Sequence, residues 1–335
     1  MSASADIKGK VVLLTGGTGS FGNAFVKRLL ADQEPASIRI YSRDELKQLE
    51  MQRRFEGEDR LRFLLGDVRD VERLKRAMRG VDVVIHAAAL KQVPAAEYNP
   101  FEAVQTNIIG AENVVTAAIE NRVPKTLALS TDKAVNPVNL YGATKLCAEK
   151  IFVQSNTYAT EGDELSARFA CARYGNVVGS RGSVIPLFKR QAAEGRITVT
   201  DEAMTRFWIT LEQAVQFVID CLARLQGGEV FVPRMPSMRV IDIARTMAPE
   251  AEVETIGIRP GEKIHEMLLT PEEARHAAAF ESYFAIYPSF PFWRSAEFPA
   301  GEELQPGFAY SSDTNDRWVE PDALREMVAG IAPVA

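Results

Sequence analysis

The sequence predicts an α/β protein with a doubly wound parallel sheet and a smaller carboxy-terminal lobe. Short aliphatic runs alternate with amphipathic segments through the first half of the chain. Such alternation is typical of a parallel sheet with helices on both faces. The alternation loosens beyond about residue 176. We therefore expect residues 1–176 to form the main domain and 177–335 mainly a second, substrate-binding lobe, with later segments crossing back.

Individual elements follow from hydrophobic periodicity. The stretch KVVLLTGGTGSFGNAFVKRLL passes from an aliphatic run through glycines into an amphipathic segment, which predicts strand, turn and helix. Further strands are expected at 37–42, 61–67, 81–89 and 126–131. Further helices are expected at 44–55, 70–80, 107–122, 139–159, 205–226 and 240–248.

Composition excludes several classes of protein. The 335 residues are 46% hydrophobic and 25% charged, as in ordinary soluble proteins, and the formal charge of -6 argues against a nucleic-acid-binding face. Three cysteines (Cys147, Cys171 and Cys221) are expected to be reduced and buried, and no spacing of Cys and His predicts a metal site. No apolar stretch has the length of a membrane helix, so we expect a cytoplasmic protein.

The glycines of TGGTGSFG predict a dinucleotide site. Gly16, Gly19 and Gly22 lie between the first strand and the first helix. There they permit a tight turn, close approach of a pyrophosphate, and close packing of helix on strand. The prediction is thus a Rossmann-type domain, with Thr18, Ser20 and Phe21 of the same turn also at the cofactor.

The end of the second strand favours NADP over NAD. NAD sites usually place an acid there, for the adenosine ribose, whereas this chain has Ser42 and Arg43, with Lys47 one turn later. Asp44 is close enough to leave NAD open. Other positions expected at the cofactor lie after the third and fourth strands: Asp67, Val68, Ala87, Ala88 and Ala89. His86 is interpreted as a packed strand residue.

Tyr141 and Lys145 are four residues apart, on one face of a predicted helix. An ammonium beside the phenol would lower the tyrosine pKa towards neutrality, so the tyrosine could remove a hydroxyl proton while hydride leaves the same carbon. Thr131 supplies a neighbouring hydroxyl. Asp132 and Lys133, just upstream, add an acid and an amine that simple oxidation does not require.

Several motifs together resemble one family. They are TGGTGSFG, HAAALKQVPAAEYNP, STDKAVNPVNLYGATK, RYGNVVGSRGSVIP and RPGEKIHEML. The chain resembles an extended short-chain dehydrogenase/reductase of the nucleotide-sugar type, and more narrowly the UDP-N-acetylglucosamine 4,6-dehydratases that invert C5 in pseudaminic acid-type biosynthesis. The resemblance runs nearly from end to end. It implies a bound NADP recycled in each turnover, a UDP-sugar substrate, and a homo-oligomer, either a dimer or a hexamer.

The resemblance also implies roles for the four charged or phenolic residues. Tyr141 would be the base at O4, Lys133 the base at C5, and Asp132 the acid that protonates the departing C6 hydroxyl. This chemistry requires a neutral Lys133 and a protonated Asp132. Dehydratases that retain C5 configuration carry Asp-Glu here. The lysine therefore predicts inversion, to a 4-keto-6-deoxy sugar of L-arabino configuration.

Residues expected at the nucleotide sugar come from both halves of the chain. By resemblance, Asn176 and the nearby Arg173 would meet the diphosphate, Arg259 a phosphate, and Glu262 a ribose hydroxyl. The remaining candidates are Lys91 for the sugar or diphosphate, and Thr198 and Thr200 for the uracil.

Other functions stay open from the residues. A nucleotide-sugar 4-epimerase also uses a Tyr/Lys pair but has no need of Asp132 and Lys133. A second alternative is a related enzyme that continues to a C5-epimerised or reduced sugar. A third is a non-catalytic NADP-binding regulator, although such proteins tend to lose the tyrosine that this chain keeps as Tyr141. The nucleotide base and the C2 substituent stay open as well.

Overall fold

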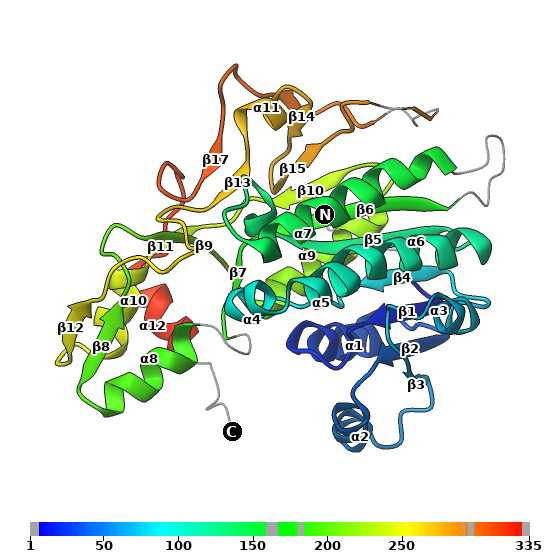
Figure 1. Ribbon diagram of the computed structural model, residues 1–335, viewed down its shortest axis with the longest axis horizontal. Coiled ribbons are helices and arrows are strands. Elements are labelled where there is room, and N and C mark those ends of the chain that lie inside the picture. The colour runs from blue at the N-terminus through cyan, green and yellow to red at the C-terminus, as the bar shows by residue number, and fades with distance from the viewer. Residues whose placement is uncertain (1–6, 159–166, 180–183, 291, 294–297, 330–335) are drawn as a thin grey trace.

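The computed structural model describes residues 7–158, 167–179, 184–290, 292–293 and 298–329. Residues 180–183, within RYGNVVGSRGSVIP, lie outside the described residues. A ten-stranded sheet crosses the larger part of the molecule, and a smaller lobe lies beside it (Figure 1).

Most elements of the large part come from the first half of the chain. The strands of its sheet are β1 (Val11–Thr15), β2 (Ser37–Ser42), β3 (Leu61–Leu65), β4 (Val83–His86), β5 (Lys125–Thr131), β6 (Arg168–Tyr174), β10 (Val230–Pro233), β14 (Ala277–Ala279), β15 (Tyr283–Ile286) and β16 (Glu302–Glu303). Its helices are α1 (Ser20–Asp32), α2 (Glu45–Arg54), α3 (Val71–Ala77), α4 (Val93–Tyr98), α5 (Pro100–Val104), α6 (Gly110–Glu120), α7 (Leu140–Gln154), α9 (Leu211–Arg224) and α11 (Pro271–Ala274). Shorter helical segments are η1 (Gln105–Ile109), η2 (Asp132–Ala134) and η3 (Ser155–Tyr158).

The order of the sheet is β16-β14-β15-β10-β6-β5-β4-β1-β2-β3. From β3 to β10 neighbouring strands are parallel, whereas β15, β14 and β16 continue it antiparallel. The run β3-β2-β1-β4-β5-β6 is the dinucleotide-binding order, with its switch point between β1 and β4. The predicted Rossmann-type fold is confirmed, and the antiparallel edge is an addition to it.

The second half of the chain contributes to both parts of the molecule. Strand β10 pairs with β6 in the large sheet, and α9 packs against α1. The lobe contains β7 (Asn176–Val177), α8 (Val184–Ala193), β8 (Arg196–Val199), β9 (Thr205–Ile209), β11 (Ser237–Arg239), α10 (Val240–Met247), β12 (Glu252–Thr255) and α12 (Pro321–Ala329). Its core is a separate cluster around Phe188, Trp208 and Ile243. Strands β13 (Met267–Leu269) and β17 (Tyr310–Ser311) pair nearby.

The predicted helix over 205–226 is wrong in its first turn. Residues Thr205–Ile209 form β9, which is buried along its whole length, and the helix α9 begins at Leu211. Thr210 caps that helix: its side chain accepts from the Gln213 backbone, and the Gln213 side chain accepts in return. A fully buried strand lacks alternation, so its apolar run read as a continuation of the helix.

Two further expectations need correction. Helices α4 and α5 and the start of the π-helical η1 lie before residue 107, where the expected helix begins, and were not predicted. Cys147 is exposed on α7, although Cys171 and Cys221 are buried as expected. His86 is packed as predicted: it is 2% exposed, its Nδ1 lies 2.9 Å from Thr15 Oγ1, and its ring stacks on Phe152.

Arg173, expected near the substrate diphosphate, is a buried structural residue instead. It is 1% exposed, and its guanidinium donates to Glu149 on α7, to Glu273 on α11 and to the Leu268 carbonyl. With two carboxylates and a carbonyl already bound, it has no free face for a phosphate. It ties α7 to the carboxy-terminal part of the chain.

Removing this buried guanidinium should destabilise the fold. Arg173→Met leaves Glu149 and Glu273 without their shared partner, and we expect the free energy of unfolding to fall by about 3–5 kcal/mol. Denaturant unfolding measures it. Arg60→Met is the matched control, because the Arg60–Glu58 pair lies near the surface and should contribute less than about 1 kcal/mol. Equal losses in both variants would contradict a special role for Arg173.

Candidate functional site

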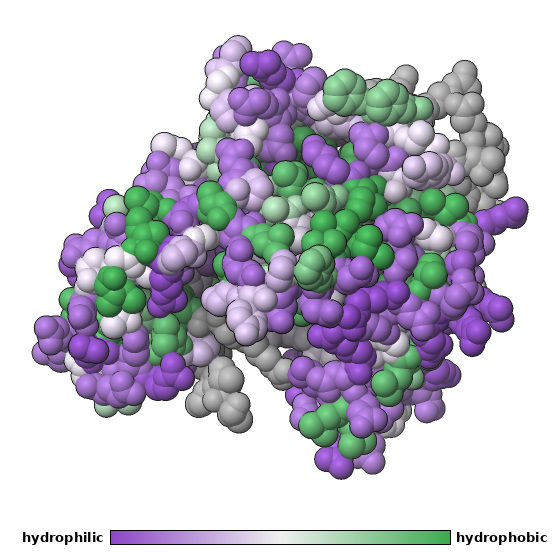
Figure 2. Space-filling view, viewed as in Figure 1, coloured by the Kyte–Doolittle hydropathy of each residue, from purple (hydrophilic) through white to green (hydrophobic). Residues whose placement is uncertain are grey.

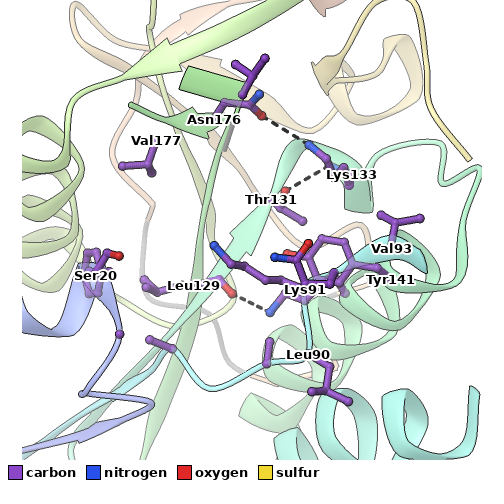
Figure 3. Close-up of a pocket in the computed structure, with 18 of the residues that line it drawn as sticks. Ser20, Leu90, Lys91, Val93, Leu129, Thr131, Lys133, Tyr141, Asn176 and Val177 are labelled. Atoms are coloured by element: carbon purple, nitrogen blue, oxygen red, sulfur yellow. Dashed lines mark hydrogen bonds between the residues drawn. The ribbon is translucent and has the colours of Figure 1, made fainter. Parts of the chain in front are cut away.

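A cavity of about 1570 Å³ opens at the carboxyl ends of β1, β2, β4, β5 and β6, and the lobe forms its other side. The predicted cofactor residues line one part of it. The residues expected to be catalytic line the middle: Thr131, Lys133, Tyr141 and Lys145. The expected substrate residues line the rest: Lys91, Asn176, Thr198, Thr200, Arg259 and Glu262. In Figure 3, Ser20 lies on the opposite side of the cavity from Lys133 and Tyr141. Asp132 is buried directly behind this wall.

The glycine turn is shaped for close approach. Gly16 has a φ of +65°, and a Cβ there would lie 2.8 Å from the Ala88 backbone nitrogen. A Cβ on Gly22 would lie 2.1 Å from the Gly17 carbonyl oxygen. Gly19 is the N-cap of α1, so the positive end of that helix faces the cavity. Thr18, Ser20, Phe21, Ala87, Ala88 and Ala89 line the same part of the cavity. These residues fit a dinucleotide pyrophosphate.

The carboxyl ends of β2 and β3 form the far end of the cavity. Asp44 caps α2 by accepting from the Lys47 backbone at 3.0 Å, and its other oxygen pairs with Lys47 Nζ at 2.7 Å. The Arg43 side chain is 56% exposed, and its Nη1 forms a long ion pair of 3.8 Å with Asp67 Oδ2. Ser42, Asp67 and Val68 complete this end of the cavity. The Asp44 carboxylate is thus engaged with its own helix, while the Arg43 guanidinium is available.

Tyr141 and Lys145 face the cavity from α7, but not with the expected electrostatics. Lys145 Nζ donates to the Leu129 carbonyl at 2.7 Å (Figure 3). Burial raises the pKa of Tyr141 to about 12, although Lys133 and a hydrogen bond with Thr131 act to lower it. The expectation of a lowered tyrosine pKa is therefore wrong for the protein without ligands, because the phenol is buried near the Asp132 carboxylate.

Asp132 and Lys133 form an ion pair on η2. Asp132 is 0% exposed, and its Oδ1 accepts from Thr131 Oγ1 at 2.8 Å and from Lys133 Nζ at 3.0 Å. Its Oδ2 has no hydrogen-bond partner among the described residues. Lys133 Nζ also donates to Asn176 Oδ1 at 3.4 Å, and these two side chains point toward one another (Figure 3).

The charge state of Lys133 differs from the expectation. Burial acts to lower the pKa of this amine, but Asp132 and Glu266 outweigh burial and the pKa is raised. The amine is therefore charged when the site holds no substrate. A neutral base requires that substrate binding or a proton transfer change this balance.

The carboxy-terminal turn at 259–263 is held against α7 and the segment that precedes it. Asn139, the N-cap of α7, donates to the Gly261 carbonyl at 2.8 Å, and Lys263 Nζ donates to the Val135 carbonyl at 2.6 Å. Arg259 faces Glu262 at 3.9 Å and is 53% exposed. One oxygen of Glu262 is buried with no hydrogen-bond partner among the described residues.

The threonines expected at the uracil line the cavity, but both are engaged by protein. Thr198 Oγ1 accepts from Gln191, and Thr200 Oγ1 lies 3.2 Å from the Met204 sulfur. Sequence reasoning missed Glu266, which lines the cavity and is 3% exposed. It stands in the motif RPGEKIHEML. Only the folded chain brings it to Lys133, so no local signal separates it from the acids around it.

Comparison with known proteins identifies the family. The family described as a polysaccharide biosynthesis protein matches residues 12–288. The chain belongs to this family. An inverting UDP-N-acetylglucosamine 4,6-dehydratase from Campylobacter jejuni is 51% identical over 328 residues, covering 95% of this chain and 97% of that protein. This match confirms the resemblance inferred from the motifs.

Two other proteins similar to this chain are not named as dehydratases. A UDP-glucose 4-epimerase from Rickettsia conorii is 42% identical over 285 residues, covering 83% of this chain and 82% of that protein. The X-ray structure of Pen from Bacillus thuringiensis superposes with a TM-score of 0.86 at 38% identity, covering 97% of this chain and 99% of that one. Within the described ranges, no helix is long and apolar enough to cross a membrane, and no cluster of His, Cys, Asp and Glu could hold a metal ion.

The glycine turn gives a direct test of dinucleotide binding. Gly22→Ala places a methyl group against the Gly17 carbonyl, and overpacking of about 1–3 kcal/mol should weaken NADPH binding roughly tenfold or more. Quenching of protein fluorescence by NADPH measures this. Lys27→Ala, on the exposed face of the same helix, should bind as the wild type does. Unchanged affinity in Gly22→Ala would remove the turn from the site.

Proposed function

We propose that the chain is an inverting UDP-N-acetylglucosamine 4,6-dehydratase. One observation supports this most: Lys133 lines the same cavity as Tyr141 and forms an ion pair with Asp132, which is buried behind it. Oxidation alone has no use for the pair, whereas elimination of water needs an acid and a base beside the oxidising centre. The identity to the Campylobacter jejuni dehydratase supports the same reaction and substrate.

The proposed chemistry distributes three proton transfers over this wall. Tyr141 takes the O4 proton, and Lys145, held by the Leu129 carbonyl, stabilises the phenolate that forms. The resulting C4 ketone acidifies the C5 hydrogen, which Lys133 removes. Asp132, which is paired with Lys133, donates a proton to the departing C6 hydroxyl. A bound nicotinamide would supply the hydride chemistry, and C5 takes a proton on its opposite face to complete the inversion.

This sequence of steps gives each residue a required starting charge. Asp132 must carry a proton and Lys133 must have lost one, yet in the protein alone they are 3.0 Å apart as an ion pair. Transfer of a proton from Lys133 to Asp132 would produce both required states at once, with no net change in charge. The close Nζ to Oδ1 contact supports such a transfer on substrate binding.

The proposed cofactor is NADP. Arg43 is largely exposed at the end of β2 and could pair with a 2′-phosphate, with Ser42 beside it. Asp44, the acid that could have served an NAD ribose, is engaged by Lys47. In the substrate half, Arg259, Asn176 and Lys91 would meet the diphosphate or sugar, Glu262 a ribose hydroxyl, and Thr198 and Thr200 the uracil.

A homo-oligomer is part of the same proposal. Tyr98 on α4 and Phe101 on α5 are 85% and 83% exposed. Figure 2 shows hydrophobic residues gathered on the face formed by the helices α5, α6 and α7. A second copy of the chain would cover this apolar face, as the resemblance to the dehydratase family implies.

Product analysis tests the reaction. We expect UDP-N-acetylglucosamine in deuterated water to give a 4-keto-6-deoxy sugar with deuterium at C5 and inverted configuration, detected by NMR. Lys133→Ala should lose nearly all product, since it removes the proposed C5 base. A product that keeps its C6 hydroxyl would instead support 4-epimerisation, which the match to the Rickettsia conorii protein favours.

Arg43 tests the choice of cofactor. Arg43→Ala should weaken NADPH binding by about tenfold, the cost of one charge-assisted pair, and leave NADH binding nearly unchanged. Calorimetric titration with each nucleotide gives the ratio. Lys47→Ala is the control and should have a smaller effect, because Lys47 already pairs with Asp44. Parallel losses for both nucleotides would argue against a 2′-phosphate at Arg43.

A further inference from the structure

Glu266 contacts Lys133 from the carboxy-terminal part of the chain. The residue immediately precedes β13 and is 3% exposed. Its Oε1 lies 3.5 Å from Lys133 Nζ and 3.9 Å from Arg206 Nε, and its Oε2 lies 3.6 Å from Lys263 Nζ. Oε2 is buried and has no hydrogen-bond partner among the described residues. Burying a carboxylate in this way is costly unless charges nearby compensate it.

The backbone of Glu266 is held rigidly. Its amide donates to Ser312 Oγ at 2.9 Å, and its carbonyl accepts from the Ser312 amide at 2.8 Å. Ser312 is itself 0% exposed, and its Oγ lies 2.7 Å from Thr205 Oγ1. These hydrogen bonds fix the backbone from which the Glu266 carboxylate points toward Lys133.

Three elements converge on the amine of Lys133. Asp132 on η2, Asn176 on β7 and Glu266 before β13 each present an oxygen to Nζ, at 3.0, 3.4 and 3.5 Å. The other titratable or charged groups that face Lys133 or Glu266 are Tyr141, Lys91, Arg206 and Lys263. Glu266 is thus the second carboxylate in a surrounding that is otherwise cationic or phenolic.

We propose that Glu266 is a positioning residue for Lys133, fixing the amine at the cavity wall and stabilising the ammonium that forms when it takes the C5 proton. This inference rests on the proposed dehydratase function. In that step the C5–H bond breaks, the proton forms a new N–H bond on Nζ, and the electron pair moves toward the C4 carbonyl. Glu266 lowers the free energy of the charged state, so it makes the amine a stronger base.

The pH dependence of turnover tests this role. Glu266→Gln keeps the size of the side chain and removes its negative charge, which lowers the pKa of the Lys133 amine. The singly protonated Asp132–Lys133 pair, from which the neutral amine forms by internal transfer, then persists to lower pH. The acidic limb of the kcat profile should therefore move to lower pH by about one unit or more. Deuterium incorporation at C5 should slow at the pH optimum, since the weaker base removes the proton less readily.

Matched variants separate this role from a structural one. Glu229→Gln removes another buried glutamate, which accepts from the Gln226 and Gly227 amides away from the cavity, and should leave the limb in place. Glu266→Asp withdraws the charge by one methylene and should move the limb in the same direction by less. This variant decides the matter if Glu266→Gln does not fold.

The outcomes are distinct. A limb that stays at its wild-type pH in a folded Glu266 variant overturns the role of Glu266 and leaves the dehydratase proposal intact. A wild-type chain that yields no 4-keto-6-deoxy product overturns both. A shifted limb with slowed C5 exchange, and an unshifted limb in Glu229→Gln, supports the positioning role.

Discussion

The convergence of parallel strand ends is the constraint on which the site depends. Strands β1, β4, β5 and β6 run the same way side by side, so everything that follows their carboxyl ends meets at one edge of the sheet. The glycine turn, the alanines after β4 and η2 after β5 are all brought together by this one fact. The approach of Gly16 to Ala88, across the β1/β4 boundary, is close enough that only glycine is tolerated there.

Electrostatics then distinguishes the two halves of the cavity. At the glycine turn, backbone amides and a helix N-terminus face the cavity, so few side-chain charges are needed to hold a pyrophosphate. At η2, buried charges are packed close together, with Asp132 and Glu266 balancing Lys133, Arg206 and Lys263. Removing one charge from such a group lowers stability, because a buried charge without its partner is costly. Arg173, Glu149 and Glu273 follow the same rule in the core, where they support α7 from behind.

Sequence reasoning recovered the first half of the fold because each element there has its own local signal. Aliphatic runs, glycines and capping acids such as Asp44 and Asp70 all act within a few residues. It failed at β9, where complete burial removes alternation, and at Arg173, whose partners lie 24 and 100 residues away in the chain. The candidate residues of the cofactor and catalytic motifs do gather at one cavity. Their charge states could not be read from spacing. The pKa of Tyr141 depends on burial and on the nearby Lys133 and Asp132, and that of Lys133 depends on burial, on Asp132 and on Glu266, a residue distant in sequence.

The turn at 259–263 contacts the segment between η2 and α7 through two hydrogen bonds, from Asn139 to the Gly261 carbonyl and from Lys263 to the Val135 carbonyl. Both bonds join the lobe to the segment that carries Asp132, Lys133 and Tyr141. Movement of the lobe away from the sheet would have to break them before the cavity widened. Because the same segment carries Asp132, Lys133 and Tyr141, any displacement of the turn at 259–263 is coupled to the position of these side chains.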